Sequence, residues 1–171
     1  MGQAKGLKGA GRWIGLLALL LTMATLTPAL AAKVKKMPDF SEETVLGNTK
    51  IDSASLRGQV VLVNFWATWC PPCRKEIPSL MEMQEKYRAR GFTILGVSMD
   101  EGGRKLVSNF LEKLKVNYPV IIGDTALARG FGGVMGVPAT FLVDRQGNLV
   151  KRYDGYVSEK ILSGEIEKLL D

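Results

Sequence analysis

The chain has 171 residues, of which 46% are hydrophobic and 23% are charged, a composition typical of a globular protein with one domain and its own core. Its formal net charge is +6. Three basic residues lie in the first 31, so the remainder has a net charge of only +3. This remainder carries no basic stripe interleaved with aromatic residues, which argues against nucleic-acid binding. Because the chain has no histidine and only two cysteines, a zinc site within one chain is not expected.

The first 31 residues have the layout of a secretory signal peptide. Lys5, Lys8 and Arg12 form a positive region without acidic residues, and residues 14–26 are predominantly apolar. An Ala-Leu-Ala sequence then predicts cleavage after Ala31. A retained anchor is the alternative, because the run that contains this apolar stretch is near the shortest length that spans a bilayer.

Both alternatives place the rest of the chain outside the cytoplasm, in a compartment where disulfides persist. In a bacterium this is the periplasm or another exported location, and a retained anchor would attach the chain to the inner membrane. Residues 32–37 are predicted to be a tether, in which Lys33, Lys35 and Lys36 form a small basic cluster. The cluster is expected to be solvated, and loose contact with anionic lipid is the minor alternative. The folded domain is expected to cover residues 38–171.

Turn residues separate the predicted strands and helices of the domain. Residues 37–58 alternate short apolar pieces with turn residues and predict a hairpin, and the valine-rich run 60–66 predicts a central strand buried on both faces. Residues 70–90 predict a helix that ends at Gly91 and is kinked by Pro78. Residues 92–99 predict a second buried strand.

The second half continues the alternation of strands and helices. Residues 104–115 and 125–131 predict helices that flank a short strand at 118–122. Strands at 139–143 and 149–153 form a predicted hairpin, and Ser158 is expected to cap a last helix. Parallel strands in the first part of the domain and an antiparallel hairpin near its end predict an α/β domain with a mixed central sheet and helices on both faces.

The two cysteines, Cys70 and Cys73, are separated by two prolines, directly after the central strand and at the start of the long helix. This Cys-x-x-Cys position is typical of a reversible dithiol/disulfide couple. Unpaired N–H groups and the helix dipole favour the thiolate of the first cysteine. A structural disulfide is the alternative, but so short a loop removes little unfolded-state entropy. Haem attachment would require His where Arg74 stands.

The chain resembles the TlpA/ResA-like exported thiol-disulfide oxidoreductases of the thioredoxin superfamily over about residues 38–170. The first motif is VNFWATWCPPCRKEIP, residues 63–78, and the second is GVPATFLVD, residues 136–144. The resemblance implies a thioredoxin-like fold with an N-terminal hairpin. It also implies that residues 100–133 are a central insertion of a helix and a strand.

The resemblance also implies roles for individual residues. Cys70 matches the attacking cysteine, and Cys73 matches the more buried resolving cysteine. Pro138 matches a cis-proline that faces the disulfide, where a trans proline is the commoner case for an arbitrary X-Pro pair. The backbone of Val137 is then expected to pair with a substrate segment in the manner of a β-strand.

Three more residues belong to the predicted site. Glu76 matches an acid associated with thiol tuning or proton handling, and its alternative is a plain helix-dipole partner. Asn64 stands where classical thioredoxin has a buried Asp, and because Asn exchanges no proton at neutral pH, Glu76 or water must take that task. Trp69, like Trp66, is expected either to shield the sulfurs and dock substrate or simply to pack.

The expected activity is that of a thiol-disulfide oxidoreductase, a protein-disulfide reductase without metal or organic cofactor. The resemblance implies protein thiol and disulfide substrates, apocytochrome c among them, a membrane electron-donor oxidoreductase and a monomeric enzyme. One rival is a peroxiredoxin-type thiol peroxidase, whose Pro-x-x-x-Thr-x-x-Cys frame is missing before Cys70. A non-catalytic thioredoxin-fold binding or chaperone module is another, and a net oxidant is the third. The two prolines between the cysteines favour a reductant over an oxidant.

Overall fold

The computed structural model describes residue 2 and residues 35–171. The predicted leader and the start of the predicted tether therefore lie outside the described residues, apart from Gly2. Among the described residues, no helix is long and apolar enough to cross a membrane.

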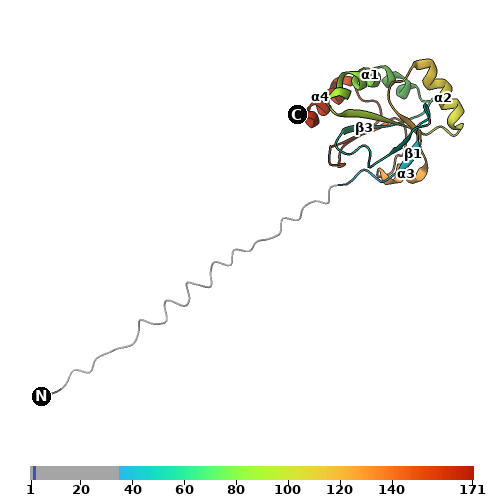
Figure 1. Ribbon diagram of the computed structural model, residues 1–171. Helices are drawn as coiled ribbons and strands as arrows, with labels where there is room; N and C mark the ends of the chain where they lie inside the picture. The colour runs from blue at the N-terminus through green and yellow to red at the C-terminus, as the bar shows by residue number, and fades with distance from the viewer. Residues whose placement is uncertain (1, 3–34) are drawn as a thin grey trace. The chain divides into compact units, whose positions relative to one another are not determined.

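Strands and helices alternate in the predicted order (Figure 1). The strands are β1 (Ser41–Glu43), β2 (Lys50–Asp52), β3 (Val60–Trp66), β4 (Phe92–Ser98), β5 (Val120–Ile122), β6 (Ala139–Val143) and β7 (Leu149–Asp154). The helices are α1 (Pro71–Tyr87), with a 3-10 turn η1 (Arg88–Arg90) after it, α2 (Gly103–Leu114), α3 (Thr125–Gly130) and α4 (Glu159–Leu170). Helix α1 runs through Pro78 without interruption, and Gly91 ends the 3-10 turn with a φ of 82°, which glycine adopts without strain.

The main sheet has five strands in the order β5-β4-β3-β6-β7. Strand β3 pairs in parallel with β4 and antiparallel with β6, and β4 pairs in parallel with β5. All seven residues of β3 are buried, as predicted for a central strand. The β1–β2 hairpin forms a separate two-stranded antiparallel sheet.

Alternation along β3 divides the core into two layers. Leu62 and Trp66 face a cluster that includes Ile77 of α1 and residues of α2 and α4. Phe65 faces the other cluster, where its ring lies 5.2 Å from that of Phe131, just after α3. Helices α1 and α4 thus cover one face of the sheet and α3 the other (Figure 1), which confirms the predicted layering.

The prediction that Ser158 caps the last helix is confirmed for its position only. Ser158 is the N-cap residue of α4 with extended backbone, but its side chain makes no capping hydrogen bond. Its carbonyl accepts bonds from the N–H groups of Ile161 and Leu162. The preceding backbone N–H, that of Val157, donates instead to the Glu76 carboxylate on α1 at 2.8 Å.

Candidate active site

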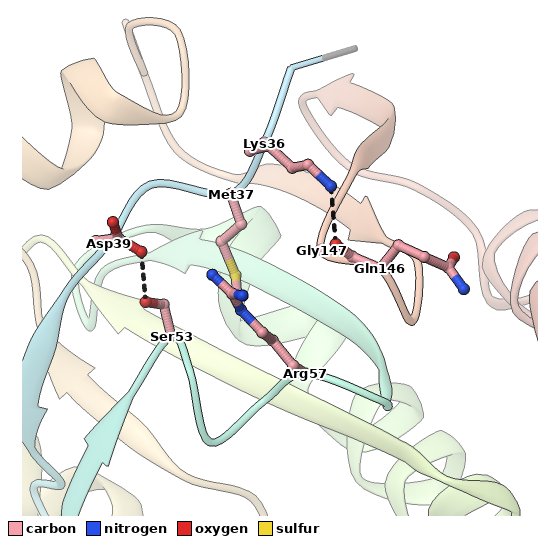
Figure 2. A pocket seen from close by; sticks show the side chains of 7 residues that line it. All are labelled: Lys36, Met37, Asp39, Ser53, Arg57, Gln146 and Gly147. Carbon is pink, nitrogen blue, oxygen red and sulfur yellow. Dashed lines mark hydrogen bonds between the residues drawn. The ribbon is translucent and has the colours of Figure 1, made fainter.

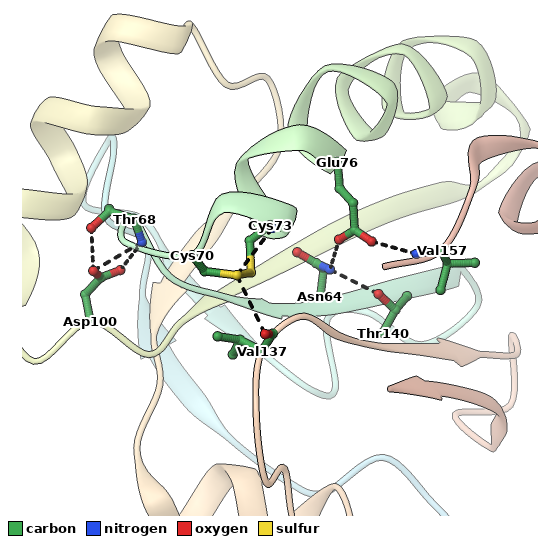
Figure 3. Close-up of a disulfide and its surroundings, with 9 residues drawn as sticks. All are labelled: Asn64, Thr68, Cys70, Cys73, Glu76, Asp100, Val137, Thr140 and Val157. Carbon is green, nitrogen blue, oxygen red and sulfur yellow. Dashed lines mark hydrogen bonds between the residues drawn. A yellow bond between two sulfur atoms is a disulfide. The ribbon is translucent and has the colours of Figure 1, made fainter. Parts of the chain in front are cut away.

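Cys70 and Cys73 form a disulfide at the point where β3 gives way to α1, with 5.3 Å between their Cα atoms (Figure 3). Cys70 is the N-cap residue of α1 and has extended backbone, and the N–H of Cys73 donates to its sulfur at 3.3 Å. Pro71 and Pro72 fit the first helical positions because those positions need no N–H donor. Because the two prolines carry no N–H, the helix N-terminus offers one N–H group to the first sulfur, that of Cys73.

Both cysteines are buried, with 2% of Cys70 and 1% of Cys73 exposed. The first turn of α1, residues 71–74, contains no acidic side chain, so no carboxylate there opposes a thiolate. A cysteine at a helix N-terminus is the environment that activates thiols as nucleophiles. Cys70 occupies the N-cap position, and Cys73 lies in the first turn of the helix.

The loop before β6 faces the disulfide. The Val137–Pro138 peptide bond is cis, as predicted, and the carbonyl oxygen of Val137 lies 3.6 Å from the Cys70 sulfur. Figure 3 shows this carbonyl directly beside the disulfide. A backbone carbonyl so close to the sulfur can guide an extended substrate segment, since strand-like pairing uses main-chain groups.

Glu76 is the acidic group of the site and is 1% exposed. Its Oε1 accepts from the Val157 N–H at 2.8 Å, and its Oε2 accepts from Asn64 Nδ2 at 3.4 Å. Burial raises the pKa of this carboxyl above its ordinary value, and the two hydrogen bonds offset part of the rise. Burial, and then the charge of Glu76, also raise the pKa of nearby Tyr118.

Asn64 connects the acid to the sheet. Its Nδ2 also donates to Thr140 Oγ1 at 3.0 Å, and Asn64 and Thr140 are opposite each other in the β3–β6 pairing. All three polar side chains are buried, so the sheet orients Asn64 and Asn64 orients Glu76 (Figure 3). Burial with partners stabilises such a network.

Asp100 was not among the predicted site residues, yet it holds the loop that precedes Cys70. Its carboxylate accepts from the Thr68 N–H at 3.0 and 3.2 Å, from the Thr68 hydroxyl, and from the Ser98 hydroxyl at 2.8 Å (Figure 3). Its position directly after β4 was the available signal, because parallel β3 and β4 end at the same edge of the sheet.

Trp66 and Trp69, the two tryptophans near the cysteines in the sequence, differ in exposure. Trp66 is 2% exposed and packs in the core, whereas Trp69 is 66% exposed beside the disulfide. Two further apolar side chains are also exposed: Met135, two residues before Val137, and Tyr156, next to Val157. Trp69 therefore lies at the surface next to Cys70, and Trp66 does not.

Among residue 2 and residues 35–171, no group of three or more His, Cys, Asp or Glu side chains is arranged to hold a metal ion. Figure 2 shows one hollow of the surface, at the other end of β3 from the disulfide. It is lined by Lys36, Met37, Asp39, Ser53, Arg57, Gln146 and Gly147. These residues gather where β3 begins and the β6–β7 turn lies, whereas the disulfide follows the other end of β3.

Comparison with known proteins gives a consistent family. The Redoxin family model matches residues 32–170. Thiol-disulfide oxidoreductase ResA of Bacillus thuringiensis (strain Al Hakam) is 35% identical over 135 residues, which are 79% of this chain and 77% of that protein. ResA of Bacillus subtilis (strain 168) is 32% identical over 125 residues, 73% and 69% of the two chains.

Solved structures agree in fold. A thiol:disulfide interchange protein of the thioredoxin family from Chlorobium tepidum TLS superposes with a TM-score of 0.75 at 35% identity, covering 82% of this chain and 99% of the other. A secreted thiol-disulfide isomerase from Corynebacterium glutamicum gives a TM-score of 0.73 at 27% identity, with 79% and 85% covered. The thioredoxin-like fold is confirmed.

Proposed function

The chain belongs to the Redoxin family and to the ResA-like thiol-disulfide oxidoreductases of the thioredoxin superfamily, and on this premise we propose that it reduces protein disulfides outside the cytoplasm through Cys70 and Cys73. The observation that carries the proposal is the cysteine pair at the N-terminus of α1, with the Val137 carbonyl 3.6 Å from the first sulfur. The helix N-terminus supports Cys70 as the attacking sulfur, and the neighbouring carbonyl supports the Val137 backbone as a strand-like guide for the substrate.

The reduced protein acts by two exchanges. The Cys70 thiolate attacks one sulfur of the substrate disulfide, forming a mixed disulfide while the other substrate sulfur leaves as a thiolate. Cys73 then loses its proton and attacks the Cys70 sulfur, which releases the second substrate thiolate. The substrate has gained two electrons and, after protonation, two protons, and the protein holds the Cys70–Cys73 disulfide. A dithiol donor must reduce that disulfide before the next cycle.

Glu76 is proposed to handle the proton that Cys73 gives up. Its raised pKa brings the carboxyl closer to neutral pH, where proton exchange is effective. Asn64 cannot exchange a proton, but it donates to Glu76 and so positions it. The Val137 backbone and Pro138 are proposed to receive an extended substrate segment, and Trp69 to cover the reacting sulfurs.

The compartment and the clients rest on the sequence. The leader-like residues 1–31 and the resemblance to exported enzymes support action in the periplasm or at the cell exterior, and one structural relative is named as secreted. The same resemblance supports exported thiol proteins such as apocytochrome c as substrates and a membrane electron-donor oxidoreductase as the source of electrons.

The test is reduction of insulin disulfides by the full chain in mild detergent, with dithiothreitol as electron source. The wild-type protein should accelerate reduction well above dithiothreitol alone, and Cys70→Ser should abolish the acceleration, because only the attacking sulfur starts the exchange. Full activity in Cys70→Ser would refute the mechanism. Absence of turnover in the wild type would favour a non-catalytic binding module. Cys73→Ser should trap the mixed disulfide, whose partners can then be identified by mass spectrometry.

A further inference from the structure

A hollow of about 460 Å³ adjoins the active site between α1 and α2. It is lined by Thr68, Arg74, Lys75, Phe110, Lys113 and Leu114. Thr68 lies two residues before Cys70, and the Arg74 N–H donates to the Cys70 carbonyl at 3.1 Å, so the hollow begins within one helical turn of the reacting sulfur. Its size is within the range of small-molecule sites and suits one or two side chains of a bound protein segment.

The charged residues that line this hollow are all positive. Three of its six lining residues are cationic and none is acidic. Within residues 35–171, the ion pairs involve other cations, and Arg74, Lys75 and Lys113 take part in none of them. Arg74 and Lys75 instead lie over the rings of Phe110 and Tyr156, 5.8 and 5.1 Å from the centroids.

Two acids next to lining residues of the hollow, Asp100 and Glu112, are engaged elsewhere. Asp100 is buried beneath Thr68, and its oxygens are occupied by hydrogen bonds from Thr68 and Ser98. Glu112 of α2 lines a different hollow and accepts from the Ser108 hydroxyl. The floor combines these cations with apolar surface from Phe110 and from Leu114, which is 39% exposed.

From this charge and shape, and on the basis of the proposed function, we propose that the hollow is the specificity pocket of the enzyme and that it selects protein disulfides flanked by acidic residues. An acidic side chain of the substrate would meet the free cations of the hollow while its disulfide reaches Cys70. Complementary charges at a rim act mainly on the rate of encounter and on partner choice. One charge pair in contact at the surface gives about 1 kcal/mol in water, which corresponds to about a 5-fold change in rate.

The test uses three synthetic peptides that each contain one intramolecular disulfide flanked by two Glu, two Gln or two Lys. The reduced full chain is mixed with each oxidised peptide at low ionic strength, and the second-order rate constant is measured after acid quenching. The Glu peptide should react about 5- to 20-fold faster than the Lys peptide, with the Gln peptide between them, and the difference should shrink in 1 M salt.

Two variants of α2 locate the effect. Lys113→Gln should lower the rate with the Glu peptide about 3- to 5-fold and leave the Gln peptide unchanged. Lys105→Gln removes the same charge from the same helix but lines another hollow, and it should change neither rate. Equal rates for the Glu and Lys peptides, or equal losses in the two variants, would overturn the specificity pocket while leaving reduction itself intact. If none of the peptides and no insulin were reduced, the proposed function would fail first.

Discussion

Glu76→Gln is the substitution that separates a functional acid from a structural one. The variant removes one buried negative charge but retains an oxygen that can accept from the Val157 N–H, which donates to Glu76 at 2.8 Å. The Asn64 amide can turn to pair with the new amide, because it is held otherwise only by Thr140. The fold should therefore survive. The free energy of unfolding should fall by well below the roughly 1–3 kcal/mol expected for leaving a buried donor without an acceptor.

The spacing of Cys70 and Glu76 along α1 gives the expected size of the effect of the substitution on Cys70. Cys70 lies six positions before Glu76, which corresponds to about 9 Å along the axis of an α-helix. At an effective dielectric constant of about 20, two negative charges at that distance repel by about 1.8 kcal/mol. Since about 1.4 kcal/mol corresponds to one pH unit, the pH midpoint of Cys70 alkylation should fall by about one unit in Glu76→Gln.

The assay is the rate of iodoacetamide alkylation of the reduced protein between about pH 6 and 9, the range in which such thiols titrate, with the modified cysteine identified by mass spectrometry. Glu82→Gln is the matched control, because Glu82 is an exposed acid farther along the same helix and should leave the profile in place. Superimposable profiles for wild type and Glu76→Gln would refute the coupling and leave Glu76 as a partner of the helix dipole only.

Two other outcomes follow from the buried acids. Asp100→Ala should lower the free energy of unfolding, measured by urea denaturation, by about 2–4 kcal/mol, because it removes the acceptor from Thr68 and Ser98. It should also slow insulin reduction. The control Glu101→Ala, at the exposed neighbouring residue, should change neither quantity. Because burial raises the folded-state pKa of Glu76 above 4.5, its stabilisation is full below that pH and is lost as pH rises through the folded-state pKa. Wild type should thus lose stability relative to Glu76→Gln as pH rises above 4.5, and a constant difference would contradict this.

Local sequence patterns predicted most of the fold, because the relevant signals lie within a few residues of one another. The valine-rich run of β3, the turn at Gly91 and the period of the amphipathic helices each depend on neighbouring side chains. The cis bond at Val137–Pro138 was predicted only from its motif, since an isolated X-Pro pair favours trans. Composition alone would not have located it.

The polar network of the site depends on contacts that no local pattern contains. Asn64 and Thr140 are 76 positions apart, Glu76 and Val157 are 81 apart, and Thr68 and Asp100 are 32 apart. Each pair meets because the sheet and its covering helices bring distant segments together. The same holds for the cationic hollow, whose two walls come from α1 and α2.

The two carboxylates near the disulfide show how burial and donors together decide the role of an acid. Asp100 receives bonds from the Thr68 backbone, the Thr68 hydroxyl and the Ser98 hydroxyl, so its charge is used to hold the loop before Cys70. Glu76 is more deeply buried but receives only one short bond, from Val157, and one long bond, from Asn64. Burial therefore exceeds compensation at Glu76 and raises its pKa. This partly uncompensated charge is the reason that we propose Glu76, and not Asp100, as the acid that exchanges protons with the thiols.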